Sequence, residues 1–233
     1  MALAQGDRTA SSRFKAWFPP IFFALVAAGT LPVVFTHLFV PSAAVAPSAA
    51  AIFGREYADE QLPAFDRRPW LIHAHAVIGL VLVVVGPLQF WRGFRNRHRR
   101  FHRLAGYTLA AVLALLAVTG FAVALAYPFA GLAGAAPNFV WMAAILACLG
   151  LAIFNARRRN ILEHEAWMTR AMAITLGVTF ASLYIPLLTG VLRLPSRTAL
   201  AVSFWLGVGE CLAVAEAWLR RPGRPRAARR RSP

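Results

Sequence analysis

The sequence predicts an all-α membrane protein, a polytopic bundle of transmembrane helices, and three observations support this class. Hydrophobic residues make up 59% of the chain, charged residues only 15%, and the mean hydropathy is +0.57. A soluble domain usually carries about a quarter charged residues. The apolar residues occur in blocks of about 20, the length that a helix needs to cross about 30 Å of hydrocarbon. A transmembrane β-barrel would instead show shorter segments of alternating polarity.

Six spans are expected from these apolar blocks. The first contains prolines, which membrane helices tolerate because neighbouring groups satisfy the freed carbonyls. A loop follows it, with a low-complexity stretch from Pro41 and a mixed-charge part from Arg55 to Arg68. Later connections are a basic loop, a short uncharged turn at 128–137 and a charged loop at 157–165. The expected spans are residues 17–40, 70–91, 104–127, 138–156, 166–192 and 198–219.

Basic residues are distributed unevenly between the two ends of these spans. If the N-terminus is cytoplasmic, 20 of the 25 Lys and Arg residues lie in cytoplasmic segments, chiefly in the loop at 92–103 and in the C-terminal tail. The positive-inside rule therefore places both termini in the cytoplasm. The net charge of +16 then indicates topology and attraction to anionic lipids of the bilayer rather than nucleic-acid binding. In the alternative reading, the first block is a cleaved signal peptide, and the five remaining spans keep the same orientation.

The chain accordingly divides into three parts. A basic cytoplasmic N-terminus is expected at 1–16, a six-helix transmembrane domain at 17–219 and an Arg-rich cytoplasmic tail at 220–233. The expected location is the bacterial inner, or cytoplasmic, membrane, which the chain crosses several times. The two cysteines, Cys148 and Cys211, lie inside spans without a metal-binding spacing and are expected to be small packing residues.

Histidines gather at both ends of the expected bundle, where an ionisable side chain is costly unless it is paired. His37, His73 and His75 fall near the outer face. His73 and His75 are two residues apart on one helix, so at most one of them is expected to face inward. His37 with either of them would form a plausible pair between neighbouring spans. Interfacial histidines bonded to water or carbonyls are the alternative interpretation.

The inner face carries the second group. His102 and His164 are expected at the starts of two spans and at the same depth, each among arginines that include Arg103 and Arg170. Imidazoles from two helices on an iron, with arginines on the propionates, are what a b-type haem requires. A quinone head group or a lipid phosphate would use similar groups. A zinc site would need about four ligands, which His98, His102, Glu163 and His164 would supply.

Two further polar residues lie inside spans. Glu210 is near the middle of the last span, and a carboxylate there must be paired or protonated. It is therefore a candidate for proton relay or for a hydrogen bond to another helix. Gln89, near the inner end of its span, is a candidate for a helix–helix hydrogen bond or for a contact with a cofactor.

Three stretches carry a resemblance to a known family. They are HAVIG at 75–79 running into GPLQF at 86–90, HRLAGY at 102–107 and HEAWMTR at 164–170. Together they resemble the DUF2306 family of bacterial and fungal multi-spanning membrane proteins, over residues 70–192. The similarity to b561-type cytochromes is looser, because no single span here has histidines at both ends. The DUF2306 resemblance implies that the family pattern is carried by His75, Gln89, His102, Arg103, His164, Trp167, Met168 and Arg170.

The leading functional hypothesis is a membrane protein that binds a redox cofactor, a b-type haem or a quinone, at its cytoplasmic rim for electron transfer. His102 and His164 would be the iron ligands, with Arg103 and Arg170 as anchors for anionic groups. One alternative is a non-enzymatic assembly or scaffold protein for a respiratory complex. Another is a small proton-coupled transporter that uses Glu210 and Gln89. No catalytic residue is assigned.

Overall fold

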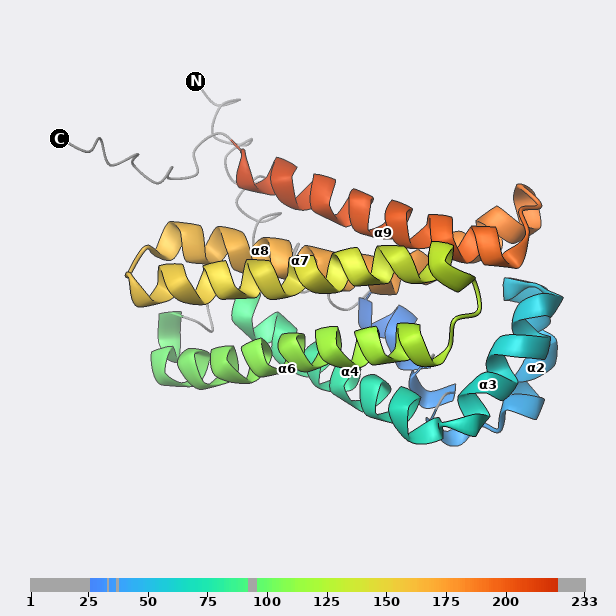
Figure 1. Cartoon of the computed structure of the whole chain (residues 1–233). Coiled ribbons are helices and arrows are strands. Elements are labelled where there is room, and N and C mark those ends of the chain that lie inside the picture. Colours follow the sequence, from blue (N-terminus) through green and yellow to red (C-terminus); the bar gives the residue numbers. More distant parts are fainter. Residues whose placement is uncertain (1–25, 33, 37, 92–95, 222–233) are drawn as a thin grey trace, which may run out of the picture.

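A computed structural model describes residues 26–32, 34–36, 38–91 and 96–221 of the chain. Within these residues all regular structure is helical. Five long helices run side by side and form the bundle in Figure 1, which confirms the all-α class. They are α4 (Pro69–Phe90), α6 (Arg99–Ala126), α7 (Gly131–Arg157), α8 (Ile161–Pro186) and α9 (Ser196–Leu219).

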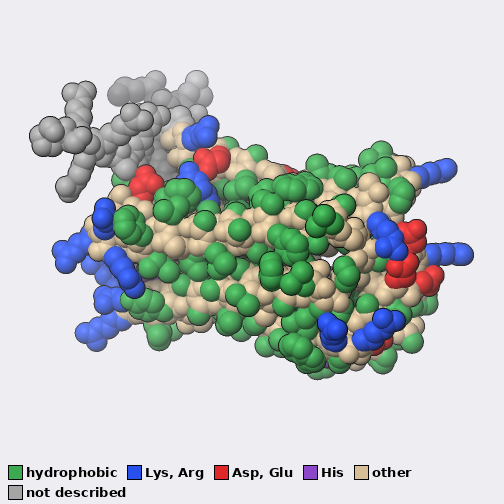
Figure 2. Space-filling model, in the orientation of Figure 1, with side chains coloured by type: hydrophobic (Ala, Val, Ile, Leu, Met, Phe, Trp, Pro, Cys, Tyr) green, Lys and Arg blue, Asp and Glu red, His purple; other side chains and the backbone are tan. Residues whose placement is uncertain are grey.

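Each of the five long helices is long and apolar enough to cross a membrane. Figure 2 shows hydrophobic side chains over the middle of the bundle and charged side chains gathered at its two ends. Large apolar side chains are exposed along these helices, among them Val84, Val118 and Leu125. Such exposure suits a lipid-facing surface, whereas in water it would be an aggregation hazard.

Helices adjacent in the sequence are neighbours in the bundle. α4 packs against α6, α6 against α7, α7 against α8 and α8 against α9, and α7 also contacts α9. The core is apolar, with Leu109, Leu113, Ile145 and Val208 almost completely buried. This order places α7 between α6 and α8, the two helices whose first turns carry His102 and His164.

α8 and α9 approach each other closely through two glycines. A Cβ atom added to Gly177 would lie 2.5 Å from the Cα of Val208, and one added to Gly207 would collide with the carbonyl of Gly177. Small residues at a crossing let helix backbones approach, which is how membrane helices gain van der Waals contact without a hydrophobic driving force between them.

A group of shorter helices, which we call the cap, lies at one end of the bundle (Figure 1). It consists of α2 (Ser42–Phe53), the π-helix η1 (Tyr57–Gln61) and α3 (Leu62–Arg67). The prediction of a loop between the first two spans is therefore wrong for these residues, which are helical. The low-complexity stretch is rich in alanine, the strongest helix former, and its helix can bury a side against the rest of the cap.

The cap has a small core of its own and several ties to the bundle. Ala49, Leu62 and Phe65 of the cap are buried together with Tyr127, the residue that follows α6. The Tyr127 hydroxyl donates to the Arg68 carbonyl at 2.6 Å. Elsewhere the guanidinium of Arg197, in the first turn of α9, binds Glu60 through one nitrogen at 2.7 and 2.5 Å, and it also donates to the Phe129 carbonyl. Gly54 ends α2 with φ +92°, and a side chain there would collide with Ser196.

The expected spans agree with the helices to within a few residues at most ends, with three differences, all at helix starts. α8 begins at Ile161, five residues before the expected start, so part of the expected charged loop at 157–165 is helical. α7 begins at Gly131, inside the expected turn at 128–137, and Pro137 lies within this helix. Asn138 strengthens this turn by donating to the Gly134 carbonyl at 2.9 Å. α6 begins at Arg99, five residues before the expected start, so charged residues of the basic loop form its first turn.

The remaining expected span, residues 17–40, comes first along the chain. Its residues 26–32 and 34–36 form a short apolar helix, named here the N-terminal apolar segment, and residues 17–25, 33 and 37 lie outside the described residues. The number of six spans, the cytoplasmic placement of both termini and the cleaved-signal alternative therefore stay predictions.

Candidate functional site

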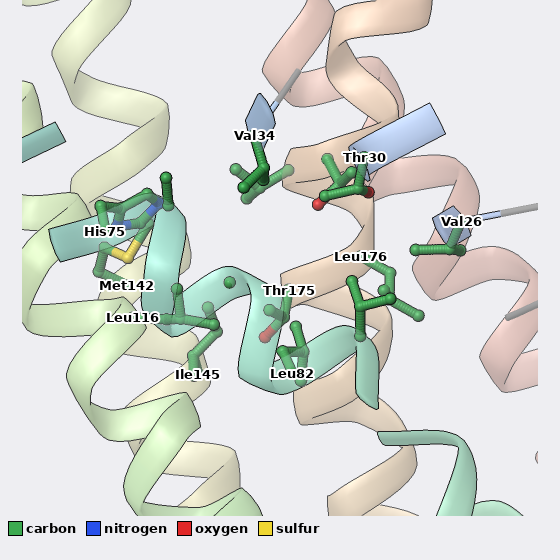
Figure 3. A pocket seen from close by; sticks show the side chains of 15 residues that line it. Val26, Thr30, Val34, His75, Leu82, Leu116, Met142, Ile145, Thr175 and Leu176 are labelled. Carbon is green, nitrogen blue, oxygen red and sulfur yellow. The ribbon is translucent and has the colours of Figure 1, made fainter. Parts of the chain in front are cut away.

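A cavity of about 140 Å³ lies inside the bundle, between the N-terminal apolar segment, α4, α6, α7 and α8 (Figure 3). Most of its wall is aliphatic, with Leu82, Leu116 and Ile145 among the lining residues. The polar side chains that line it are His75, Thr30, Thr175 and Thr179. An apolar cavity with a few polar groups is the usual form of a small-molecule site.

His75 is the nitrogen-bearing side chain of this wall. It stands on α4, and its Nδ1 lies 2.8 Å from the Oγ1 of Thr119 on α6. That hydroxyl also lies 2.7 Å from the Leu115 carbonyl of its own helix. The ring sits beside Gly120, where an added Cβ would lie 3.5 Å from its Cε1 and 2.8 Å from the Cε of Met142. The glycine on α6 thus leaves the space that the end of the Met142 side chain occupies next to the imidazole.

Of the histidines predicted near the outer face, His73 and His75 lie differently in the structure. His75 lines the cavity, whereas His73, two residues earlier on α4, is not one of the lining residues. His37 lies outside the described residues, so its pairing with either histidine stays a prediction. The nearest described residues of its segment, Val34 and Thr30, do line the cavity together with His75.

The threonines of the cavity differ in how their hydroxyls are used. Thr175 donates to the Ala171 carbonyl at 2.9 Å, one turn earlier on α8. The Oγ1 of Thr30 is buried, and no hydrogen-bond partner for it is found among the described residues. A buried polar atom without a partner in a native fold calls for an explanation. A polar ligand atom in the cavity would supply one.

At the other end of the bundle, two predicted residues join helices. The Gln89 side chain donates to the His102 carbonyl at 3.3 Å, which ties the end of α4 to the start of α6. The His164 Nδ1 lies 2.9 Å from the Ala152 carbonyl, which ties the start of α8 to α7. Gln89 therefore makes the predicted helix–helix bond. A joint role for His102 and His164 on one cofactor stays a prediction.

Arg170 has an anionic partner within the chain. Its Nε lies 2.6 Å from a carboxylate oxygen of Glu216 on α9, and its guanidinium stacks on the Trp167 ring at 4.7 Å. The other carboxylate oxygen of Glu216 lies 3.5 Å from Arg220. The sequence offers no local signal for this pair because its members are 46 residues apart. Arg103 is exposed on α6, and its role as an anchor for anionic groups stays a prediction.

Glu210, the candidate for proton relay, also has a partner on a neighbouring helix. The Tyr184 hydroxyl on α8 donates to its carboxylate. This contact matches the predicted hydrogen bond to another helix, and sequence reasoning did not single out Tyr184. A relay function for Glu210 stays a prediction.

The predicted zinc alternative is wrong for the described residues. Among them, no three His, Cys, Asp or Glu side chains are grouped closely enough to hold a metal ion. His98 is the residue before α6, whereas Glu163 and His164 lie in the first turn of α8, and α7 packs between these two helices.

With this geometry established, comparison with known proteins assigns the family. The family described as "Predicted membrane protein (DUF2306)" matches residues 72–219. This chain belongs to the DUF2306 family. No curated protein and no solved structure matches it.

The DUF2306 match begins in the first turn of α4 and ends with α9, so it covers all five long helices of the bundle. Every residue predicted to bind a cofactor lies inside it, as does Glu210. The N-terminal apolar segment and the cap lie before it. Membership confirms a membrane protein with several apolar helices. The respiratory-chain partner, the contacts with anionic lipids and the bacterial inner membrane stay predictions.

Proposed function

We propose that this protein binds a small lipophilic ring compound, of the quinone and quinol class, in the cavity beside His75. The observation that supports this proposal is the cavity itself, about 140 Å³ with a mostly aliphatic wall and one imidazole. An apolar cavity of about 150 Å³ in a protein core is large enough for benzene. A single substituted ring is therefore the size of ligand that the cavity accepts.

The polar groups restrict the ligand further. A purely hydrocarbon ligand would leave the free ring nitrogen of His75 and the Thr30 hydroxyl unsatisfied in an apolar environment, and such a group costs about 1–3 kcal/mol. A ring that carries oxygen atoms can engage both. Quinones and quinols combine a flat ring with oxygens and dissolve in the bilayer, from which a site between membrane helices is reached. This is the quinone part of the redox-cofactor hypothesis, moved from the cytoplasmic rim to the cavity.

Two glycines provide a matched test. Gly79 lines the cavity, Gly150 lies on the exposed side of α7, and a Cβ added to either meets nothing within 4 Å. Gly79→Leu should place its side chain in the cavity from a position where the added Cβ meets no other atom, and Gly150→Leu should not affect the cavity. Binding of 4-fluorophenol to the protein in nanodiscs would be followed by ¹⁹F NMR. We expect a saturable shift with the wild type and Gly150→Leu, and none with Gly79→Leu. Absence of saturable binding, or binding that survives Gly79→Leu, would overturn the proposal.

A b-type haem at the cytoplasmic rim is the second candidate, and one observation favours it. The His164 Nδ1 lies at hydrogen-bond distance from the Ala152 carbonyl, which leaves Nε2 for a ligand. Iron-ligating histidines commonly hold their other ring nitrogen in this way. The reduced-minus-oxidised absorption spectrum of the purified protein tests it. A Soret and α-band difference that His164→Ala removes would support it, and a flat spectrum from haem-supplied cells would reject it.

A further inference from the structure

We propose that the cavity selects a ring bearing a hydroxyl group, a phenol or a quinol, over one bearing a carbonyl, because Thr119 makes His75 a hydrogen-bond acceptor toward the cavity. This inference rests on the proposed function and names the redox form of the ligand that the site prefers. Its basis is the direction of two hydrogen bonds.

The first step concerns the single proton of the Thr119 hydroxyl. Its oxygen lies 2.7 Å from the Leu115 carbonyl, which can only accept, and 2.8 Å from the His75 Nδ1. A hydroxyl carries one donor hydrogen and accepts through its lone pairs. Since the hydrogen goes to Leu115, Thr119 accepts from His75. The proton of the imidazole therefore sits on Nδ1.

The second step concerns the other ring nitrogen. An imidazolium inside a membrane bundle needs a compensating anion. Among the described residues, no carboxylate pairs with His75. Its one hydrogen bond among them is to Thr119. The ring is thus neutral, and a neutral imidazole with its proton on Nδ1 has a bare lone pair on Nε2. His75 lines the cavity, so it offers an acceptor there and no donor.

The third step concerns the neighbouring hydroxyls. Thr175 gives its hydrogen to the Ala171 carbonyl and so offers only lone pairs to the cavity. Thr30 and Thr179, which also lines the cavity, can each donate or accept, and they do not discriminate between ligands. A ligand hydroxyl satisfies Nε2, whereas a ligand carbonyl would meet lone pairs at both His75 and Thr175. The site is therefore complementary to the reduced form of a quinone.

Three fluorinated rings of similar size test this selection by the same ¹⁹F titration, corrected for partition into protein-free nanodiscs. They are 4-fluorophenol, a donor; 4-fluorobenzaldehyde, an acceptor only; and 4-fluorotoluene, which is neither. We expect the phenol to bind about three- to tenfold more tightly than the toluene, the effect of one net hydrogen bond. The aldehyde can accept a hydrogen bond only from a threonine hydroxyl and finds no donor at His75, so its gain over the toluene should be smaller than that of the phenol.

Two variants at position 119 connect the preference to the proposed cause. Thr119→Val keeps the shape but removes the hydroxyl, so the imidazole is free to carry its proton on Nε2, and the ratio between phenol and aldehyde should fall. Thr119→Ser keeps the hydroxyl and should keep the ratio. A ¹⁵N spectrum of histidine-labelled protein, with the His75 signals assigned through His75→Gln, should show Nδ1 protonated and Nε2 bare.

The outcomes separate the two proposals. If none of the rings binds, the proposed function fails. If all three bind with equal affinity, or if the aldehyde binds best, the cavity is a binding site and the selection for a hydroxyl is wrong. A His75 signal with the proton on Nε2 would also overturn the selection, whatever the affinities are.

Discussion

At the scale of single residues, the chemistry of the cavity depends on a partner that the sequence does not reveal. His75 was predicted as a binding residue because it lies inside an apolar span near its end. Thr119, which sets the direction of its hydrogen bond, is 44 residues away. Nothing in hydrophobic periodicity indicates which threonine of one span faces a histidine of another. The same limit applies to Arg170, for which an anion was predicted and whose anionic partner is Glu216.

Gly177 gives a residue-scale prediction about packing. Gly177→Ala places a Cβ atom 2.5 Å from the α9 backbone, where no flexible side chain can move aside. Overpacking of this kind typically costs about 1–3 kcal/mol, so the melting temperature in detergent should fall clearly. Gly209→Ala on α9 is the control, because its added Cβ meets nothing within 4 Å. Equal melting temperatures for the two variants would contradict the close approach of α8 and α9.

Tyr57 gives a prediction about pH. It lies in the cap, outside the long helices, and burial raises its pKa to about 12. The unfolded chain loses this phenol proton near pH 10, whereas the folded protein keeps it. The buried neutral phenol therefore contributes to the free energy of unfolding. This contribution is complete below about pH 10 and is lost as the pH rises toward 12, by about 2–3 kcal/mol in all. Thermal melts between pH 9 and 11 should show a smaller decrease for Tyr57→Phe than for the wild type. Equal decreases of the melting temperature with pH in the wild type and in Tyr57→Phe would contradict the raised pKa of Tyr57.

At the scale of elements, the long helices were predictable and the cap was not. Five apolar blocks predicted five helices because length and apolar composition suffice to identify a membrane span. The cap instead forms by tertiary contact, since short helices are marginal alone. The Phe65 ring of the cap meets the ring of Tyr127, the residue after α6, at 4.9 Å. The residues before α4 were therefore predicted as a loop on their polar and low-complexity composition.

The junction of α8 and α9 gives an element-scale prediction. Arg170 and Glu216 are partly buried, with side chains 25% and 29% exposed. Removal of Glu216 leaves the Arg170 charge uncompensated, and removal of Arg170 leaves Glu216 with Arg220 alone, whereas removal of both partners leaves neither charge at this site. Arg170→Leu and Glu216→Leu should each lose about 1–3 kcal/mol of stability, and the double variant should lose less than their sum. Additive losses in a double-mutant cycle of unfolding free energies would show that the pair is not coupled.

At the scale of the whole molecule, the cap and the connection between α7 and α8 lie at opposite ends of the bundle (Figure 1). Together with the positive-inside rule, this gives a topology prediction. In a background with Cys148→Ala and Cys211→Ala, a membrane-impermeant maleimide should label Ser48→Cys in intact cells. Arg159→Cys should react only after permeabilisation. Both positions are exposed in the structure. The reverse pattern of labelling would invert the orientation.

The cavity also has a mechanical consequence for the molecule. Hydrostatic pressure favours the state of smaller volume, and internal void volume is what unfolding eliminates. A bundle with about 140 Å³ beside His75 should therefore yield to compression sooner than one whose interior is filled. Gly79→Leu, which removes the space for a ligand, should for the same reason make the protein more resistant to pressure. The unfilled space that would accept a ring should therefore also make the bundle more compressible.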